Sequence, residues 1–444
     1  MDVDNQQVGP GKWAVRFFGI WTGQAFSLIG SSVAQFALVW WVTTLTGSAT
    51  VLATAMMVAV LPGVFLGPIA GAYVDRWSRR MVMIAADAVV ALAALTLAYL
   101  FWSGSMQVWH LYVVMAVRAI GGSFHWPAMQ ASTSLMVPKE HLSRIAGLNQ
   151  TLNGVMSIAG PPLGALLLAV MPLYGIMLID VGTAAMAILP LLFIRIPQPQ
   201  RSTGMQGVAA NGKKRSIWAD VVEGLRYVWS WPGLFMVLIA AMIINFVMAP
   251  ASSLMPLLVT KHFNGDALQL GTLEAAWGVG VIAGGLFLSV WGGFRRRIYT
   301  TLLGVTLMGL GIILTGLAPS TMFWLAIAGN AIAGFMNPIT NGPLFAVLQA
   351  TVAPDYQGRV FTVVSSLASA MMPLSLAVAG PLADWLGINA WYVIGGLSCV
   401  AMGVVARFIP AIVNLEQNHR GQRVEEQALV PATVEVVVTD VDAL

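Results

Sequence analysis

The stretch Gly71-Ala-Tyr-Val-Asp-Arg-Trp-Ser-Arg-Arg80 separates two apolar runs, at roughly 50–74 and 81–103. Each run has the roughly 20 apolar residues that a helix needs to cross a bilayer. The link between them carries three arginines, which are costly inside a membrane. Lys and Arg collect in cytoplasmic loops. The stretch therefore predicts two antiparallel spanning helices joined on the cytoplasmic side.

The composition extends this prediction to the whole chain. Of the 444 residues, 58% are hydrophobic and only 9% are charged, whereas soluble domains carry about 25% charged residues. Cys399 is the single cysteine, and no pair of the five histidines has metal-ligand spacing. These features exclude a disulfide framework and a cysteine-rich metal site. We expect no cofactor, no metal and no nucleic-acid partner.

Twelve apolar runs are long enough to span a membrane, and the first is too long for a cleavable signal peptide. On this layout 20 of the 22 Lys and Arg residues fall on one side, the exceptions being Lys261 and Arg118. This distribution predicts a multi-pass protein of the cell membrane with both termini in the cytoplasm. The runs lie at roughly 15–42, 50–74, 81–103, 108–130, 145–170, 173–195, 233–257, 270–292, 299–318, 321–348, 360–386 and 389–412.

A loop at 196–232 divides these runs into two sets of six, within 1–195 and 233–412. Residues 217–229 of this loop have apolar side chains on one helical face, which predicts a helix lying on the membrane surface. Residues 413–444 are polar and predict a cytoplasmic tail.

The two sets share landmarks at a nearly constant separation, which indicates an internal duplication. Pro127 and Pro138 precede Pro343 and Pro354 by the same interval. Arg80, Arg144 and Gly160-Pro161 have partners at Arg297, Arg359 and Gly380-Pro381. Two repeats related by an axis along the membrane normal are a transporter architecture, with the substrate site between the halves. The fold class is therefore all-α, with two pseudo-symmetric six-helix bundles.

The spacing within 71–80 resembles the G-x-x-x-D-R-x-x-R-R loop of the major facilitator superfamily. That resemblance implies a latch that holds the two halves in the outward-facing state, formed by Gly71, Asp75, Arg76, Arg79 and Arg80. The alternative is a loop that only fixes topology through its positive charge. The copy at 291–297 lacks the aspartate, so the latch is expected to be asymmetric.

Residues 154–164 resemble the antiporter motif of exporters in the same superfamily. The motif residues are Gly154, Gly160, Pro161 and Gly164. Gly160 and Gly164 lie four residues apart, so they share a helical face on which another helix can pack closely. The alternative is ordinary packing of small residues.

Charged side chains inside the predicted spans are the candidates for proton coupling. Arg118 matches an arginine that the superfamily often places in the fourth helix, and a structural ion pair is its alternative role. Glu274 ranks first and Asp180 second as a proton or cation site, because a charge inside a membrane is functional by default. Asp87 is a further candidate, and Asp384 lies near a helix end.

Isolated polar residues in the spans are candidates for a central cavity. Gln24, Ser31 and Gln35 belong to one polar stripe of the first span, which faces either the cavity or a neighbouring helix. Asn245 and Asn341 are single polar residues in later spans.

The segments 124–131, 137–144 and 146–149 resemble the macrolide-efflux branch of the superfamily, which is related to enterobactin exporters. The resemblance implies a secondary transporter that exports a hydrophobic or amphipathic compound in exchange for protons, and we expect it to function as a monomer. Transport of a native metabolite such as a siderophore is the alternative. A membrane receptor and an intramembrane enzyme are other classes, but the chain has no nucleophile–base pair and no Walker motif.

Overall fold

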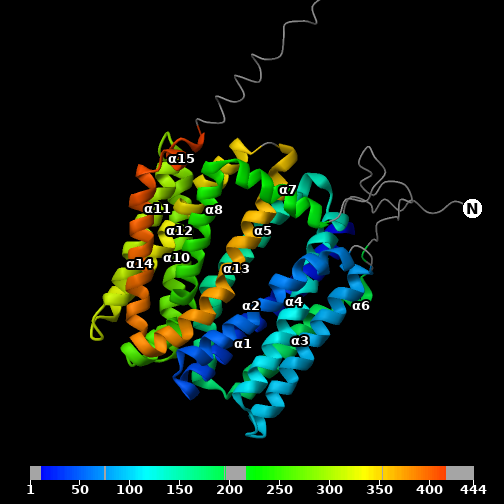
Figure 1. The fold of residues 1–444 in the computed structure, drawn as a ribbon. Helices are drawn as coiled ribbons and strands as arrows, with labels where there is room; N and C mark the ends of the chain where they lie inside the picture. The colour runs from blue at the N-terminus through cyan, green and yellow to red at the C-terminus, as the bar shows by residue number, and fades with distance from the viewer. Residues whose placement is uncertain (1–11, 75–76, 195, 197–216, 353, 417–444) are drawn as a thin grey trace, which may run out of the picture.

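The computed structural model describes residues 12–74, 77–194, 196, 217–352 and 354–416. These residues form a bundle of long helices (Figure 1). The first six long helices are α1 (Lys12–Thr46), α2 (Ala49–Val74), α3 (Arg79–Trp102), α4 (Val108–Met136), α5 (Leu142–Val170) and α6 (Leu173–Phe193). The second six are α8 (Pro232–Ser253), α10 (Ala267–Trp291), α11 (Arg297–Leu317), α12 (Phe323–Thr351), α13 (Pro354–Leu386) and α14 (Ile388–Val405).

Eleven helices of the described ranges are long and apolar enough to cross a membrane. The remaining long helix, α4, has 29 residues but carries polar side chains such as Arg118 and His125. It packs between α2 and α3 like a spanning helix. The predicted fold class is confirmed, and the chain is a multi-pass membrane protein.

The predicted helix ends differ from the observed ones mainly near prolines. The run predicted at 233–257 ends at Ser253, because Pro256 has no N–H to continue the helix. It is followed by the short α9 (Met255–Leu257) and a π-helical turn at Leu258–His262. The run predicted to begin at 360 begins at Pro354, since the first turn of a helix tolerates proline.

Each half has its own helix packing, and the repeat landmarks lie in corresponding helices. In the first half α1 packs on α5 and α6, while α3 packs on α4 and α6. In the second half α12 packs on α10 and α11, and α13 packs on α8. Pro127 lies in the fourth long helix and Pro343 in the tenth. Gly160 lies in the fifth long helix and Gly380 in the eleventh.

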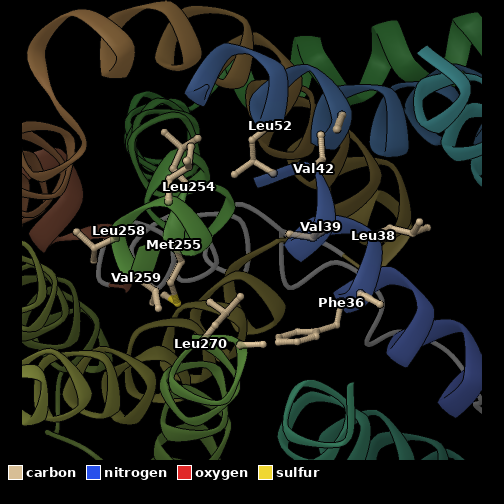
Figure 2. Packing of buried hydrophobic residues seen from close by; sticks show 14 of the residues in the cluster. Phe36, Leu38, Val39, Val42, Leu52, Leu254, Met255, Leu258, Val259 and Leu270 are labelled. Carbon is tan, nitrogen blue, oxygen red and sulfur yellow. The ribbon is translucent and has the colours of Figure 1, made fainter. Parts of the chain in front are cut away.

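The halves meet along two helix pairs, α2 with α13 and α5 with α10. The largest buried apolar cluster continues through this contact (Figure 2). In it, Val42 of α1 and Leu52 of α2 join the same cluster as Leu254 and Leu270 of the second half. This seam lies at the end of the bundle away from α7 (Figure 1).

Helix α7 (Ile217–Ser230) confirms that the 217–229 segment is helical. Its Tyr227 ring stacks on Tyr356 of α13 with ring centroids 4.8 Å apart, and Val228 is fully buried. The spacing of 217–229 predicts Leu225 on the same apolar face as Val228, but Leu225 is 41% exposed, and the contact with α13 includes Tyr227 and Val228. The rest of the loop, 197–216, and the tail from 417 lie outside the described residues.

The glycines of α10 form a packing face on which α5 and α12 lie. A Cβ on Gly278 would meet Ile158 of α5, and one on Gly280 would meet the Ala331 carbonyl of α12. Gly284 lies against the backbone of Phe335, whereas a Cβ on the adjacent Gly285 would meet nothing within 4 Å. Close helix contact through small residues stabilises helix pairs in membranes.

We therefore expect Gly284→Ala to destabilise the fold, while Gly285→Ala leaves it intact. The added methyl of Gly284→Ala overlaps a backbone carbonyl that cannot move without shifting α12, and such overpacking costs about 1–3 kcal/mol. Thermal unfolding of both variants in the same detergent measures the difference. Equal melting temperatures would show that α10 and α12 are not packed this closely.

Candidate functional site

A cavity of about 700 Å³ lies between the halves, mostly within the second. This volume is in the range of pockets that bind drug-sized molecules. Ser32 of α1 and Pro161 of α5 contribute to its wall from the first half. The wall continues to Ile298 at the start of α11 and to Ala406 directly after α14. Six methionines are part of it: Met156, Met248, Met255, Met308, Met372 and Met402.

Glu274 is the one acidic residue that lines this cavity in the described part of the chain. It lies in the second turn of α10, one helical turn from Trp277, which also lines the cavity. No hydrogen bond or ion pair to its carboxylate occurs among the described residues. An ionised carboxylate without a partner in apolar surroundings is costly. This group is therefore suited to take up a proton or to bind a cation.

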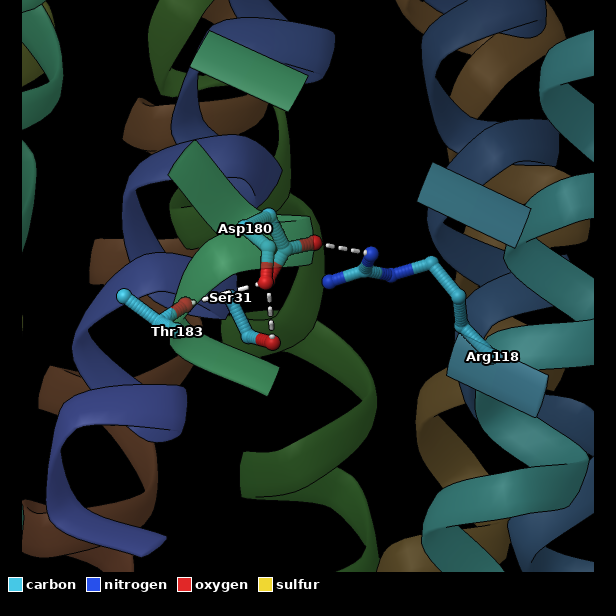
Figure 3. A network of polar contacts seen from close by, with 4 residues as sticks. All are labelled: Ser31, Arg118, Asp180 and Thr183. Atoms are coloured by element: carbon cyan, nitrogen blue, oxygen red, sulfur yellow. Dashed lines mark hydrogen bonds and ion pairs between the residues drawn. The ribbon is translucent and has the colours of Figure 1, made fainter. Parts of the chain in front are cut away.

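Arg118 and Asp180 form a buried ion pair between α4 and α6 (Figure 3). The Arg118 Nη1 atom lies 2.5 Å from Asp180 Oδ2. Ser31 of α1 donates a hydrogen bond of 2.9 Å to the other carboxylate oxygen, Oδ1. The Asp180 side chain is almost fully buried, and that of Arg118 is 11% exposed. The sequence predicts Arg118 and Asp180 as separate candidates, and the structure brings them into contact.

A second polar group lies within the first half, around Asp87 of α3. Gln24 of α1 donates a hydrogen bond of 2.9 Å to Asp87 Oδ2. The His125 Nε2 atom of α4 lies 3.3 Å from Asp87 Oδ1. Gln24 and Asp87 are both buried. This group links α1, α3 and α4.

The two arginines at the start of α3 donate hydrogen bonds to backbone carbonyls of neighbouring helices. Arg80 donates from Nε to the Leu191 carbonyl and from Nη2 to the Leu192 carbonyl, the latter at 2.5 Å. Arg79 is buried and donates from Nη1 to the Ala131 carbonyl at 3.3 Å. Leu191 and Leu192 lie in the last turn of α6, where carbonyls lack helical partners and cations stabilise them, whereas Ala131 lies five residues before the end of α4. Gly71 lies in α2, while Asp75 and Arg76 lie outside the described residues.

The glycines of α5 serve contact with α1. A Cβ on Gly160 would overlap the Ser32 hydroxyl, and one on Gly164 would lie 2.8 Å from the Phe36 ring. Gly154 has no such neighbour within 4 Å. The predicted close packing on Gly160 and Gly164 is thus present, with α1 as the neighbouring helix.

The structure divides the predicted cavity residues into three groups. Asn245 and Asn341 line the cavity and are exposed within it. Gln24 and Ser31 instead contact Asp87 and Asp180. Gln35 is half-buried and is not among the residues that line the cavity.

Sequence reasoning missed several residues of the cavity wall, namely Ser32, Trp277, Asn330, Asn337 and the six methionines. The composition gave only a partial indication of the methionines. The chain has 24 methionines, yet their number does not reveal which of them face inward.

The family model of the Major Facilitator Superfamily matches residues 20–365 and 237–441. The chain belongs to the Major Facilitator Superfamily. It is a membrane transporter with the twelve-helix architecture of that superfamily.

Relatives within the Major Facilitator Superfamily include named efflux proteins. Macrolide efflux protein A of Streptococcus pyogenes is 33% identical over 405 residues, which is 91% of this chain and 98% of the relative. Multidrug efflux pump Tap of Mycolicibacterium fortuitum is 30% identical over 403 residues, covering 87% of this chain and 94% of the pump.

Solved structures of the superfamily share the fold at low sequence identity. A nucleoside transporter matches with a TM-score of 0.69 and 11% identity, covering 88% of this chain and 98% of that chain. A bacterial homologue of the human lysosomal transporter Spinster, in an inward-facing and unoccupied conformation, matches with a TM-score of 0.60 and 15% identity. The latter match covers 93% of this chain and 98% of that one.

Proposed function

We propose that the protein exports a hydrophobic or amphipathic small molecule in exchange for protons. The observation that carries this proposal is the cavity between the halves, whose wall is largely apolar and contains the unpaired carboxylate of Glu274. An apolar pocket with a few polar groups is the common form of a small-molecule site. A lone carboxylate in it can exchange a proton for a cationic group of the substrate.

The transport step we propose is alternating access, in which residues 1–195 and 233–412 rock about the cavity. The distribution of Lys and Arg supports a cytoplasmic position for α7 and both termini. In that orientation the seam along α2–α13 and α5–α10 closes the outer end, so the described state faces inward. The 71–80 loop would act as the latch of the opposite state, and Arg118, Asp180 and Asp87 would assist proton coupling. The functional unit is the monomer.

The substrate class we propose is of the macrolide or multidrug type. Its support is the identity to Macrolide efflux protein A and to the pump Tap over most of both chains. Six methionines in the cavity wall agree with it, because thioether side chains adapt to irregular apolar shapes.

Proteoliposomes with an imposed pH gradient test the proposal. We expect protein in the inside-out orientation to accumulate a radiolabelled macrolide when the lumen is acidic. One pH unit supports about tenfold accumulation for one-to-one exchange. Nigericin, which collapses the gradient, should remove the accumulation. Uptake that is the same with and without the pH gradient would contradict proton coupling. The absence of macrolide flux both with and without the gradient would contradict the substrate class.

A further inference from the structure

Asp384, in the last turn of α13, contacts the first turn of α2 in the other half of the molecule. Its Oδ1 atom accepts a hydrogen bond from the Ala49 backbone N–H at 2.7 Å. Its Oδ2 atom accepts hydrogen bonds from the Thr50 N–H at 2.9 Å and the Thr50 hydroxyl at 2.7 Å. The Ser48 hydroxyl donates to the same oxygen at 2.9 Å. One carboxylate therefore joins the two halves through four hydrogen bonds.

The start of α2 is chemically suited to hold a carboxylate. The first N–H groups of a helix have no partner within the helix, and the helix dipole places partial positive charge there. A helix is usually capped by a residue just before it, and here Ser48 also accepts a hydrogen bond from Val51 N–H at 3.3 Å. Asp384 adds a charged acceptor from more than 300 residues further along the chain.

The backbone around Asp384 is shaped for this contact. A Cβ on Gly380, one turn earlier in α13, would lie 2.8 Å from the Thr50 Cα and 3.0 Å from the Ala53 Cβ. Ala49 and Ala53 are almost fully buried. On the other side of the seam, a Cβ on Gly271 of α10 would lie 3.1 Å from the Pro161 carbonyl of α5. Both contacts lie at the end of the bundle away from α7 (Figure 1).

Acidic side chains elsewhere in the structure make different contacts. Asp266 caps its own helix, since its side chain accepts a hydrogen bond from the Gln269 N–H at 2.9 Å. Asp87 and Asp180 contact Gln24 and Arg118, which belong to the same half as they do. Asp384 therefore differs from these three acids in the described ranges, because its partners belong to the opposite half.

We infer that Asp384 holds the outer end of the cavity closed during the transport cycle by keeping α13 in contact with α2. The inference rests on the proposed alternating access. For solute to leave at this end, α2 and α13 must separate, and all four hydrogen bonds to one carboxylate must break together. Hydrogen bonds to a charged group are stronger than neutral ones, so this side chain favours the inward-facing state.

Distances between spin labels across the outer end test the inference. Ser105, in the turn between α3 and α4, and Ser320, in the turn between α11 and α12, are exposed and belong to different halves. Both are replaced by labelled cysteines in a Cys399→Ala background, and pulsed electron resonance gives the population with a long distance. We expect Asp384→Asn to raise the ratio of open to closed populations by at least about tenfold.

Two further variants sharpen the test. Thr50→Val removes a hydroxyl donor and should shift the ratio in the same direction by less, which keeps the test available if Asp384→Asn folds poorly. Asp266→Asn removes an acidic helix cap of the same chemical kind and should leave the ratio unchanged.

The outcomes distinguish the role inferred for Asp384 from the proposed transport function. An unchanged ratio of open to closed populations in both Asp384→Asn and Thr50→Val would overturn the role of Asp384. An equal shift in Asp266→Asn would also overturn it, because any lost cap would then have the same effect. If the unmodified protein opens at this end but moves no macrolide in proteoliposomes, the proposed substrate class is wrong, while the role inferred for Asp384 is unaffected.

Discussion

Replacing Glu274 with glutamine is expected to abolish proton-driven efflux while leaving the protein folded. Glutamine keeps the size and polarity of the side chain but cannot exchange a proton in the working pH range. Glu274 lines the cavity and has no described partner that its loss would leave unpaired. We therefore expect macrolide efflux in inverted vesicles to fall at least about tenfold, which corresponds to about 1.4 kcal/mol.

A matched control for Glu274→Gln is Asn245→Ala. Asn245 also lines the cavity, but it is uncharged and donates to the Ala241 carbonyl of its own helix at 2.9 Å. Its replacement should alter the apparent affinity for the solute and leave the dependence on the pH gradient intact. Exchange of labelled for unlabelled solute without a gradient should survive in Glu274→Gln if the carboxylate serves protons alone. Undiminished gradient-driven efflux by Glu274→Gln would show that Glu274 is not the proton-coupling group.

Removing either member of the Arg118–Asp180 pair is expected to lower the stability of the protein so far that most of it no longer folds. Arg118→Leu leaves the Asp180 carboxylate buried with only Ser31 as a side-chain donor. Breaking a buried ion pair on one side costs about 3–5 kcal/mol, since it leaves an uncompensated charge. We expect Arg118→Leu and Asp180→Leu to give low yields of monodisperse protein and lower melting temperatures.

The double variant Arg118→Leu with Asp180→Leu distinguishes a structural pair from a coupling pair. Replacing both charges by apolar groups is often neutral for stability, so the fold should recover. We expect gradient-driven efflux to remain absent, because the pair is proposed to assist proton transfer. A double variant that folds and transports normally would make the pair purely structural. A double variant no more stable than the single ones would mean that the two residues do not interact.

The positions of the spanning helices could be predicted from the sequence, because the bilayer requires each of them to be long and apolar. The segment predicted at 173–195 is α6 at Leu173–Phe193, and that predicted at 50–74 is α2 at Ala49–Val74. The ends near Pro256 and Pro354 were less accurate. A proline either stops a helix or starts one, and the apolar run around it is the same in both cases.

The rotation of each helix about its axis could not be predicted in the same way. A helix in a bilayer is apolar toward lipid as well as toward its neighbours, so the polar pattern that orients a soluble helix is weak. Ser31 and Ser32 illustrate this. Ser31 donates to Asp180, while the adjacent Ser32 lines the cavity. The predicted polar stripe of the first span contained the former and missed the latter.

The pairing of Arg118 with Asp180 was also beyond the sequence. The two residues belong to different helices, and one chain without aligned relatives carries no signal of their contact. The same holds for Gln24 and Asp87, which were assigned to different roles and share a hydrogen bond.

The methionines of the cavity wall can be oxidised, which would change the chemistry of the cavity. Oxidants convert a thioether into a sulfoxide, which is polar and chiral, and exposed methionines are the common targets. Six methionines line one cavity here, and four of them, Met156, Met248, Met372 and Met402, are partly exposed, so that peroxide can reach them. Oxidation of these side chains would therefore make the apolar wall more polar, and enzymatic reduction of the sulfoxides would be needed to restore its apolar character.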